Sequence, residues 1–310
     1  MAVVFALLAA LGYAAASVLQ QRAAAEVGDE HSLKISLLVR LLKRPMWLAG
    51  FAADWVAFAF QAAALATGSL LLVQPLLTTG LLFALPIGAH WSGRRLRPRD
   101  WIAAIVLTVG LGVFLYEGSP NGGQDRASFA SWIPWLVGFG IAAGVCVVIA
   151  WRGRGTTRAL SLALATGLLY GATAALTKSS ASLLGEGIVP LVTAWEPYVL
   201  AAVALVGMVL AQSAFQAGNL EASLPTLTVS EPIIAAMIGM GLFAERLHVH
   251  HTWQWGVIGI SVVAMITGVA ILAPGKEPVA SVIADPERDG AVEPIGSVAP
   301  GADPTVTSAP

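Results

Sequence analysis

Long apolar stretches recur along the chain, each close to 20 residues, with short polar segments between them. A helix that crosses the ~30 Å hydrocarbon core of a bilayer needs about 20 mostly apolar residues. Because lipid offers no hydrogen-bond partner, each stretch is expected to be a helix rather than an open strand. We therefore predict about nine spans, over residues 2–21, 46–66, 69–90, 100–117, 131–151, 158–180, 197–218, 222–243 and 253–273.

Three segments depart from this pattern. Residues 32–44 make a helix of only about 20 Å and carry Lys34 and Arg40, so an interfacial helix is expected there rather than a tenth span. Residues 185–196 are expected to form an extramembrane connection or a re-entrant piece. From residue 274 onward the chain is rich in Pro, Ala, Gly and Val and has no periodic apolar face, which predicts a disordered tail.

Composition supports the membrane interpretation and excludes several function classes. Hydrophobic residues make up 57% of the chain and charged residues 11%, whereas soluble domains carry about 25% charged residues. The sequence has no basic stripe, so nucleic-acid binding is not expected. The single cysteine, Cys146, excludes an intrachain disulfide and a cysteine metal cluster. The sequence holds no nucleophile–base grouping, nucleotide-binding loop or HExxH motif, so we expect neither an enzyme nor a bound cofactor.

Lys and Arg concentrate in three connections, at residues 22–45, 91–99 and 152–158. With nine spans these connections fall on one side, which the positive-inside rule makes cytoplasmic. The expected protein is thus a multi-pass protein of the cell membrane, in contact with the lipid bilayer, with its N-terminus outside and its tail in the cytoplasm.

The first four predicted helices resemble the last four in the order of their motifs. Three motifs recur 155 to 157 residues later: Tyr13 as Tyr170, Phe60-Gln61-Ala62 as Phe215-Gln216-Ala217, and Gln74-Pro75 as Glu231-Pro232. One extra helix between them gives the second half the opposite sense in the membrane, as in many transporters. We predict an all-α bundle of two inverted repeats, at 1–117 and 158–273, with a linking helix in 118–157 and the tail at 274–310; if 32–44 also spans, there are ten helices.

Polar and ionisable residues inside spans are costly, so they are functional candidates. Glu231 lies near the centre of its run, and Pro232 frees the Thr228 carbonyl, as in the interrupted helices of transporter sites. The alternative is a kinked helix with a neutral, hydrogen-bonded Glu231. The full candidate set for binding a substrate or ion is Glu231, Gln74, Asp54, Thr228, Ser230, Gln216, Gln61 and Lys178.

Several candidates also have a structural interpretation. Asp54 fits a proton relay or cation site as well as it fits an interhelical hydrogen bond. Gln61 and Gln216 are more typical of polar contacts between helices, and Lys178 of a side chain that reaches the membrane interface. The histidines after Arg246 lack ligand spacing, so no metal site is assigned.

These motifs resemble those of the drug/metabolite transporter superfamily. The second half is similar to an EamA-type repeat, because it carries in order Phe215-Gln216-Ala217, Glu231-Pro232 and Glu245-Arg246-Leu247. One helix resembles the NIPA-like magnesium-transporter branch: it carries Leu169-Tyr170-Gly171 and Thr177-Lys178 and follows a separate helix and a short Arg-rich loop. The first half departs from the pattern, because Arg94-Arg95-Leu96 stands where Glu-Arg-Leu is expected.

The resemblance implies alternating access by two inverted halves that move a small solute or, in the NIPA-like branch, a divalent cation such as Mg²⁺. A third hypothesis is a membrane scaffold or partner subunit without transport, in which the polar residues inside the spans are simply packed. A homodimer is left open.

Overall fold

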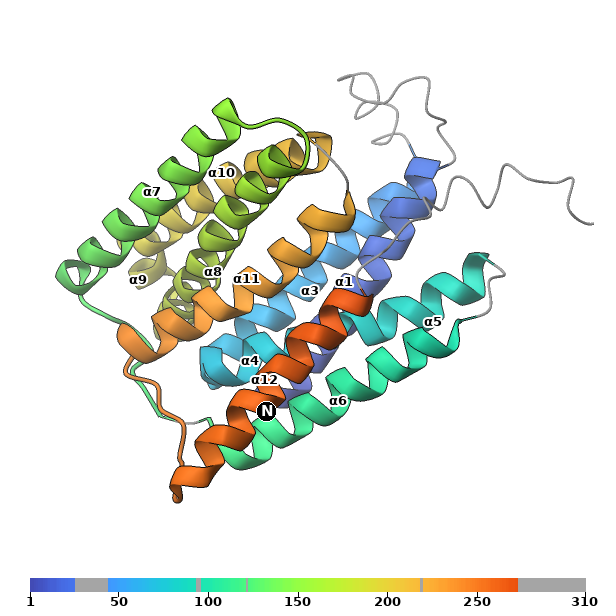
Figure 1. The fold of residues 1–310 in the computed structure, drawn as a ribbon. Coiled ribbons are helices and arrows are strands. Elements are labelled where there is room, and N and C mark those ends of the chain that lie inside the picture. Colours follow the sequence, from blue (N-terminus) through green and yellow to red (C-terminus); the bar gives the residue numbers. More distant parts are fainter. Residues whose placement is uncertain (26–43, 93–95, 121, 218–219, 273–310) are drawn as a thin grey trace, which may run out of the picture. The chain divides into compact units, whose positions relative to one another are not determined.

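The computed structural model describes residues 1–25, 44–92, 96–120, 122–217 and 220–272. Within these ranges the regular structure is helical throughout, as predicted for an all-α bundle. The helices are α1 (Ala2–Ala25), α3 (Pro45–Thr67), α4 (Leu70–Leu77), α5 (Gly80–Ser92), α6 (Pro98–Gly118), α7 (Phe129–Arg152), α8 (Thr156–Glu186), α9 (Ile188–Thr193), α10 (Glu196–Ala217), α11 (Leu220–Gly241) and α12 (Thr252–Leu272) (Figure 1).

Seven helical segments of the described chain are long and apolar enough to cross a membrane. The described apolar parts of α10 and α11, Glu196–Ala211 and Thr226–Gly241, are shorter. The chain is therefore a multi-pass membrane helix bundle, and the count of nine spans stays a prediction. The expected interfacial helix at 32–44 and the expected disordered tail at 274–310 lie outside the described residues, apart from Arg44.

The predicted span at 69–90 is divided into α4 and α5. Ser69 begins α4, because its side chain accepts a hydrogen bond from the Leu72 amide. Pro75 lies inside α4, and the break follows it at Thr78 and Thr79, whose hydroxyl groups donate to carbonyl oxygens of the preceding turn at 2.6 Å. In α11, by contrast, the helix continues through Pro232.

The segment at 185–196, expected to be an extramembrane connection or a re-entrant piece, contains the end of α8 and a short helix. Helix α8 continues to Glu186, beyond the predicted end at residue 180, and Gly187, with a φ of 127°, ends it in a conformation that favours glycine. The short α9 follows, with Ile188 and Val189 exposed over 69% and 70% of their surfaces. Sequence reasoning missed this helix because six residues are too few to show a helical period.

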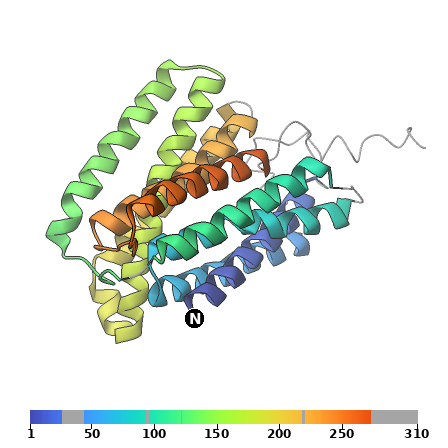
Figure 2. The same ribbon diagram turned by 60° about the horizontal axis from the view of Figure 1, so that its bottom comes forward.

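Helix packing uses small residues at close contacts. Helix α1 packs on α3, α8 packs on α10 and α11, and α6 runs beside α12 (Figures 1 and 2). A Cβ atom on Gly12 would lie 2.8 Å from Ala57, and one on Gly171 would lie 2.7 Å from Ile234. Small residues that let backbones approach are the usual device of helix association in lipid.

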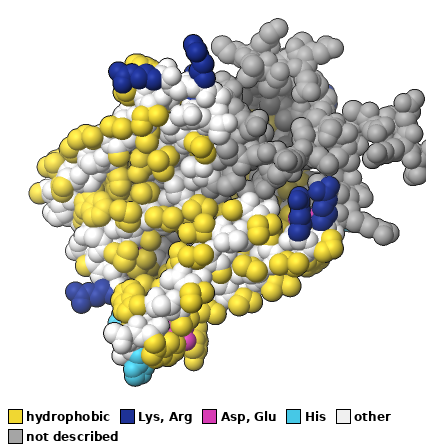
Figure 3. Space-filling view, in the orientation of Figure 1, with side chains coloured by type: hydrophobic (Ala, Val, Ile, Leu, Met, Phe, Trp, Pro, Cys, Tyr) yellow, Lys and Arg dark blue, Asp and Glu magenta, His cyan; other side chains and the backbone are white. Residues whose placement is uncertain are grey.

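Charged and apolar side chains separate along the bundle. Consecutive long helices alternate in direction, so the junctions α5–α6 and α7–α8 fall at one end (Figure 1). Described basic residues lie at these junctions: Arg97, Arg99, Arg152, Arg154 and Arg158. Apolar side chains cover much of the surface between the two ends (Figure 3), which suits a surface that contacts lipid.

Candidate functional site

Glu231 lies on α11 where that helix packs against α8. The neighbouring Ser230 is in very close contact with Gly167 of α8, so the two helices approach tightly at this level. The Glu231 carboxylate is near enough to the hydroxyl groups of Tyr13 on α1 and Tyr170 on α8 to interact with both electrostatically. We refer to Glu231, Tyr13 and Tyr170 as the Glu231 cluster.

Two other candidates, Asp54 and Gln61, lie on α3 and are bonded to α1. The Tyr13 hydroxyl donates to Gln61 Oε1 at 2.6 Å, and Gln20 Nε2 donates to Asp54 Oδ2. Asp54 also lies in electrostatic range of Tyr13. Both side chains therefore serve as interhelical contacts, and Tyr13 connects them to the Glu231 cluster.

The remaining polar candidates have different environments. Gln74 of α4 is 2% exposed, and among the described residues its Nε2 has no hydrogen-bond partner. Ser230 is buried and donates to the Leu227 carbonyl at 3.2 Å, and Thr228 is partly buried two residues earlier on α11. The side chain of Gln216 lies outside the described residues.

Lys178 forms a buried ion pair instead of reaching the membrane interface, which corrects the structural interpretation made from the sequence. Its Nζ lies 2.7 Å from Glu245 Oε1, and the two side chains are 2% and 0% exposed. The same Nζ lies 5.1 Å from the centre of the Phe243 ring and 4.0 Å from Asp125. Outward extension is a feature of residues at a helix end, whereas α8 continues past Lys178 to Glu186.

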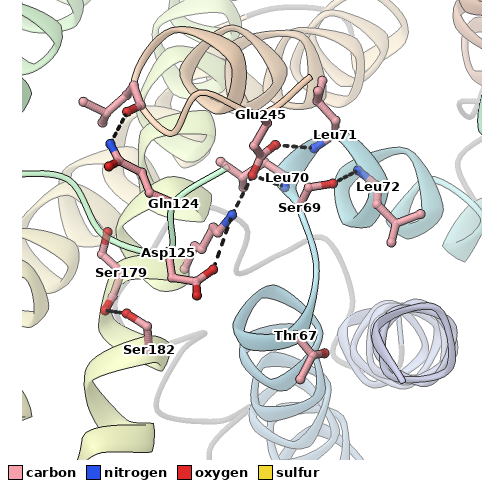
Figure 4. Close-up of polar contacts among 12 residues, drawn as sticks. Thr67, Ser69, Leu70, Leu71, Leu72, Gln124, Asp125, Ser179, Ser182 and Glu245 are labelled. Atoms are coloured by element: carbon pink, nitrogen blue, oxygen red, sulfur yellow. Dashed lines mark hydrogen bonds and ion pairs between the residues drawn. The ribbon is translucent and has the colours of Figure 1, made fainter. Parts of the chain in front are cut away.

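The Glu245 carboxylate also holds the start of α4. The backbone amides of Leu70 and Leu71 donate to its Oε1 and Oε2 at 2.8 and 3.0 Å. Figure 4 shows Glu245 placed directly at these two amides. A carboxylate is well suited to this position, because the first amides of a helix lack internal partners and carry partial positive charge.

A strap formed by Gln124, Asp125 and Arg126 ties the connection after α6 to the second half. The Gln124 amide donates to the Phe243 carbonyl at 2.7 Å, and its side chain donates to the Leu242 carbonyl at 2.9 Å. Arg126 Nε donates to Glu196 Oε1 at 2.7 Å, at the start of α10. This hydrogen bond raises the pKa of Arg126 above its usual value, so the guanidinium stays charged.

Sequence reasoning overlooked Asp125, Arg126 and Glu196 and treated Glu245 as a family motif alone. All four occupy helix ends or connections, where charges are normally solvated. The sequence signal that could have identified these ion pairs is an acidic residue beside one apolar span together with a basic residue at the end of another span. That signal is weak, because it does not say which ends meet.

Among the described residues, the candidates form no metal cluster, and they do not line the two apolar grooves described below. The described residues contain no group of three or more His, Cys, Asp or Glu side chains that could hold a metal ion. Two apolar grooves of about 350 Å³ lie between α7, α8 and α11 and between α6 and α12. Glu231, Gln74 and Asp54 line neither groove.

Together, the fold and these buried polar contacts define a multi-pass α-helical membrane protein. The chain is 36% identical over 275 residues to an uncharacterized protein of Corynebacterium glutamicum, and the match covers 88% of this chain and 94% of the relative. The chain therefore belongs to the same family as that corynebacterial protein. No protein-family model matches the chain, and no solved structure matches it.

Proposed function

We propose that the chain is a secondary transporter of a small solute, of the drug/metabolite type, with Glu231 as its central binding or coupling residue. One observation carries the proposal. Tyr13 and Tyr170 occupy corresponding places in the two similar halves of the sequence, and both lie in electrostatic range of Glu231. A carboxylate within electrostatic range of equivalent residues of both halves fits a site at a repeat interface.

The packing of the helices supports two related halves. Helix α1 packs on α3 as α8 packs on α10, so the first two helices of each half make the same contact. Helix α4 contacts α11, and α6 contacts α12, so the third and fourth helices of one half meet their counterparts. Because α7 intervenes as a single additional helix, the second half runs in the opposite sense, which is the arrangement used for alternating access.

The chemistry of Glu231 suits a coupling role. Within the described part of the chain no Lys or Arg forms an ion pair with it. An ionised carboxylate among apolar helices is costly, and a bound proton or cation offsets that cost. We infer that Glu231 binds a proton or a cationic group during transport.

A divalent cation is the second candidate substrate, and one observation favours it. Asp54 and Glu231 both lie in electrostatic range of Tyr13. Mg²⁺ keeps several of its waters and is often held by one or two carboxylates, so a cluster of three protein ligands is not required. The scaffold hypothesis instead explains Gln61 and Asp54, whose hydrogen bonds are ordinary interhelical contacts.

Flux measurements in proteoliposomes test the proposal. The purified full-length chain is assayed for uptake and export of a metabolite panel and Mg²⁺, and Glu231→Gln is compared with Glu117→Gln. Glu117 is a good control because it accepts a hydrogen bond from Gln254 of α12 at 2.8 Å, away from the cluster. We expect Glu231→Gln alone to abolish coupled flux. Equal flux in both variants removes Glu231 from the mechanism, and no flux of any solute supports the scaffold.

A further inference from the structure

The Lys178–Glu245 pair connects the two halves of the bundle through one carboxylate. Lys178 belongs to α8, Glu245 to the connection between α11 and α12, and the two amides that Glu245 accepts belong to α4 in the first half. The strap after α6 adds Asp125 beside the same amine. Four segments that are distant in sequence therefore meet at this point (Figure 4).

Glu245 is enclosed tightly enough to leave no room for larger neighbours. A Cβ atom on Gly239 would lie 2.5 Å from Glu245 Oε2, and one on Gly123 would lie 2.7 Å from Glu245 Cγ. The Glu245 amide also donates to the Gly239 carbonyl at 2.9 Å. The carboxylate is thus fixed from both sides while it binds the start of α4.

Helix α4 is built as a separate short element. It spans eight residues, is capped by Ser69 and ends at the break formed by Thr78 and Thr79. Both of its ends are element-terminal positions, which is where hinge residues of moving elements are found. Gln74, whose side chain is buried and lacks a partner among the described residues, lies one turn beyond Leu70 on the same face.

We propose that the Lys178–Glu245 pair is a gate, an inference that rests on the proposed transport function. The pair closes the transport pathway at the end of the bundle where the strap lies, by holding α4 in place. While the pair is intact, Glu245 binds the first amides of α4 and keeps Gln74 buried. When the pair separates and the Glu245 carboxylate leaves its enclosed position, the amides lose their acceptor and α4 moves about its two ends, which opens the bundle at the end where the strap lies.

The energetics of a buried pair fit this role. Two charges removed from water gain little net stability, but loss of one partner leaves an uncompensated charge and strongly disfavours the paired state. Such a pair therefore favours one discrete arrangement over others without adding much to overall stability. A gate needs that property, because it must select the closed state and still release it.

Accessibility of a buried cysteine tests the gate without a substrate. The full chain carries Cys146→Ala, which removes its single cysteine, and Val73→Cys on α4, where the native side chain is fully buried. A membrane-impermeant maleimide is applied from the side of the strap, and the labelling rate is measured for Lys178→Met and Glu245→Gln. Glu245→Gln is the milder variant, because an amide oxygen still accepts from one α4 amide.

The control is Arg126→Gln with Glu196→Gln, which removes the ion pair between the strap and α10, where Glu196 is buried and Arg126 is 43% exposed. We expect labelling to rise about tenfold or more in the gate variants and to stay unchanged in the control, since loss of one partner of a buried pair shifts an equilibrium by at least that factor. Slow labelling in all folded variants, or equal acceleration in the control, overturns the gate. Size-exclusion profiles identify folded variants.

The two proposals can fail separately. Faster labelling in the gate variants, together with normal flux in Glu231→Gln, retains the gate and rejects the Glu231 site. Unchanged labelling, together with lost flux in Glu231→Gln, rejects the gate and retains the site.

Discussion

Nζ of Lys178 and Oε1 of Glu245 lie 2.7 Å apart, although the two residues are 67 positions apart in the chain and both are buried. The Glu245 carboxylate also accepts hydrogen bonds from the first two amides of α4. Glu245, a charged residue of the second half, is therefore the hydrogen-bond acceptor at the N-terminus of α4, a helix of the first half.

Replacing Lys178 by Met should destabilise the protein. The substitution leaves the Glu245 carboxylate buried without its cation, a loss of about 3–5 kcal/mol in typical proteins. Thermal unfolding in detergent measures the change. Arg99→Met is the comparison, because Arg99 is largely exposed, lies 3.5 Å from Asp100 and should cost less than about 1 kcal/mol. Equal effects of the two substitutions would show that the buried pair contributes nothing special.

Replacing Gly171 by Ala should loosen the contact between α8 and α11. A Cβ atom there would lie 2.7 Å from two atoms of Ile234 and 3.0 Å from the Ala235 amide nitrogen. Overpacking of this kind typically costs about 1–3 kcal/mol. Gly144→Ala on α7 is the matched control, because its added Cβ meets nothing within 4 Å. Thermal unfolding of the two variants should differ, and identical midpoints would refute the tight contact.

Replacing Tyr13 by Phe should weaken the contact between α1 and α3 and alter transport. The variant loses the hydrogen bond to Gln61, which in membrane proteins is worth about 0.6 kcal/mol and at most about 1.7 kcal/mol. If Tyr13 acts only in packing, unfolding shifts slightly and flux does not. We expect flux to fall by more than the stability change explains, because the hydroxyl also lies in range of Glu231.

Side-specific labelling should confirm the orientation predicted from charge. In a Cys146→Ala background, Arg154→Cys lies at an exposed position of the α7–α8 junction and His250→Cys at an exposed position before α12. An impermeant maleimide added to intact cells should label His250→Cys and leave Arg154→Cys unlabelled until the cells are opened. The reverse pattern would invert the predicted topology.

The long helices could be predicted from sequence because the decisive property is local. Twenty consecutive apolar residues require a spanning helix whatever lies around them, and every predicted run corresponds to helix in the described structure. The break at Thr78 and Thr79 was not predicted, since an apolar run does not show where helical hydrogen bonding stops. The short α9 was missed because its few residues show no period.

The candidate site likewise contains residues that the sequence identified and contacts that it did not predict. Sequence identified Glu231 as a costly polar residue inside a span, and the order of motifs matched Tyr13 with Tyr170. Sequence did not show that both tyrosines lie in electrostatic range of that carboxylate. It gave Lys178 as a site candidate and favoured the membrane interface for its side chain, and neither interpretation predicted the pair with Glu245.

Apolar length and the positions of charge are local properties, so the sequence by itself determined a multi-pass helical membrane protein with polar candidates inside its spans. Pairing of charges across helices depends on which helix ends meet, and that is settled by the packing of small residues along the whole bundle. Only the tertiary structure therefore decided that Lys178 pairs with Glu245, and that one carboxylate holds the start of α4.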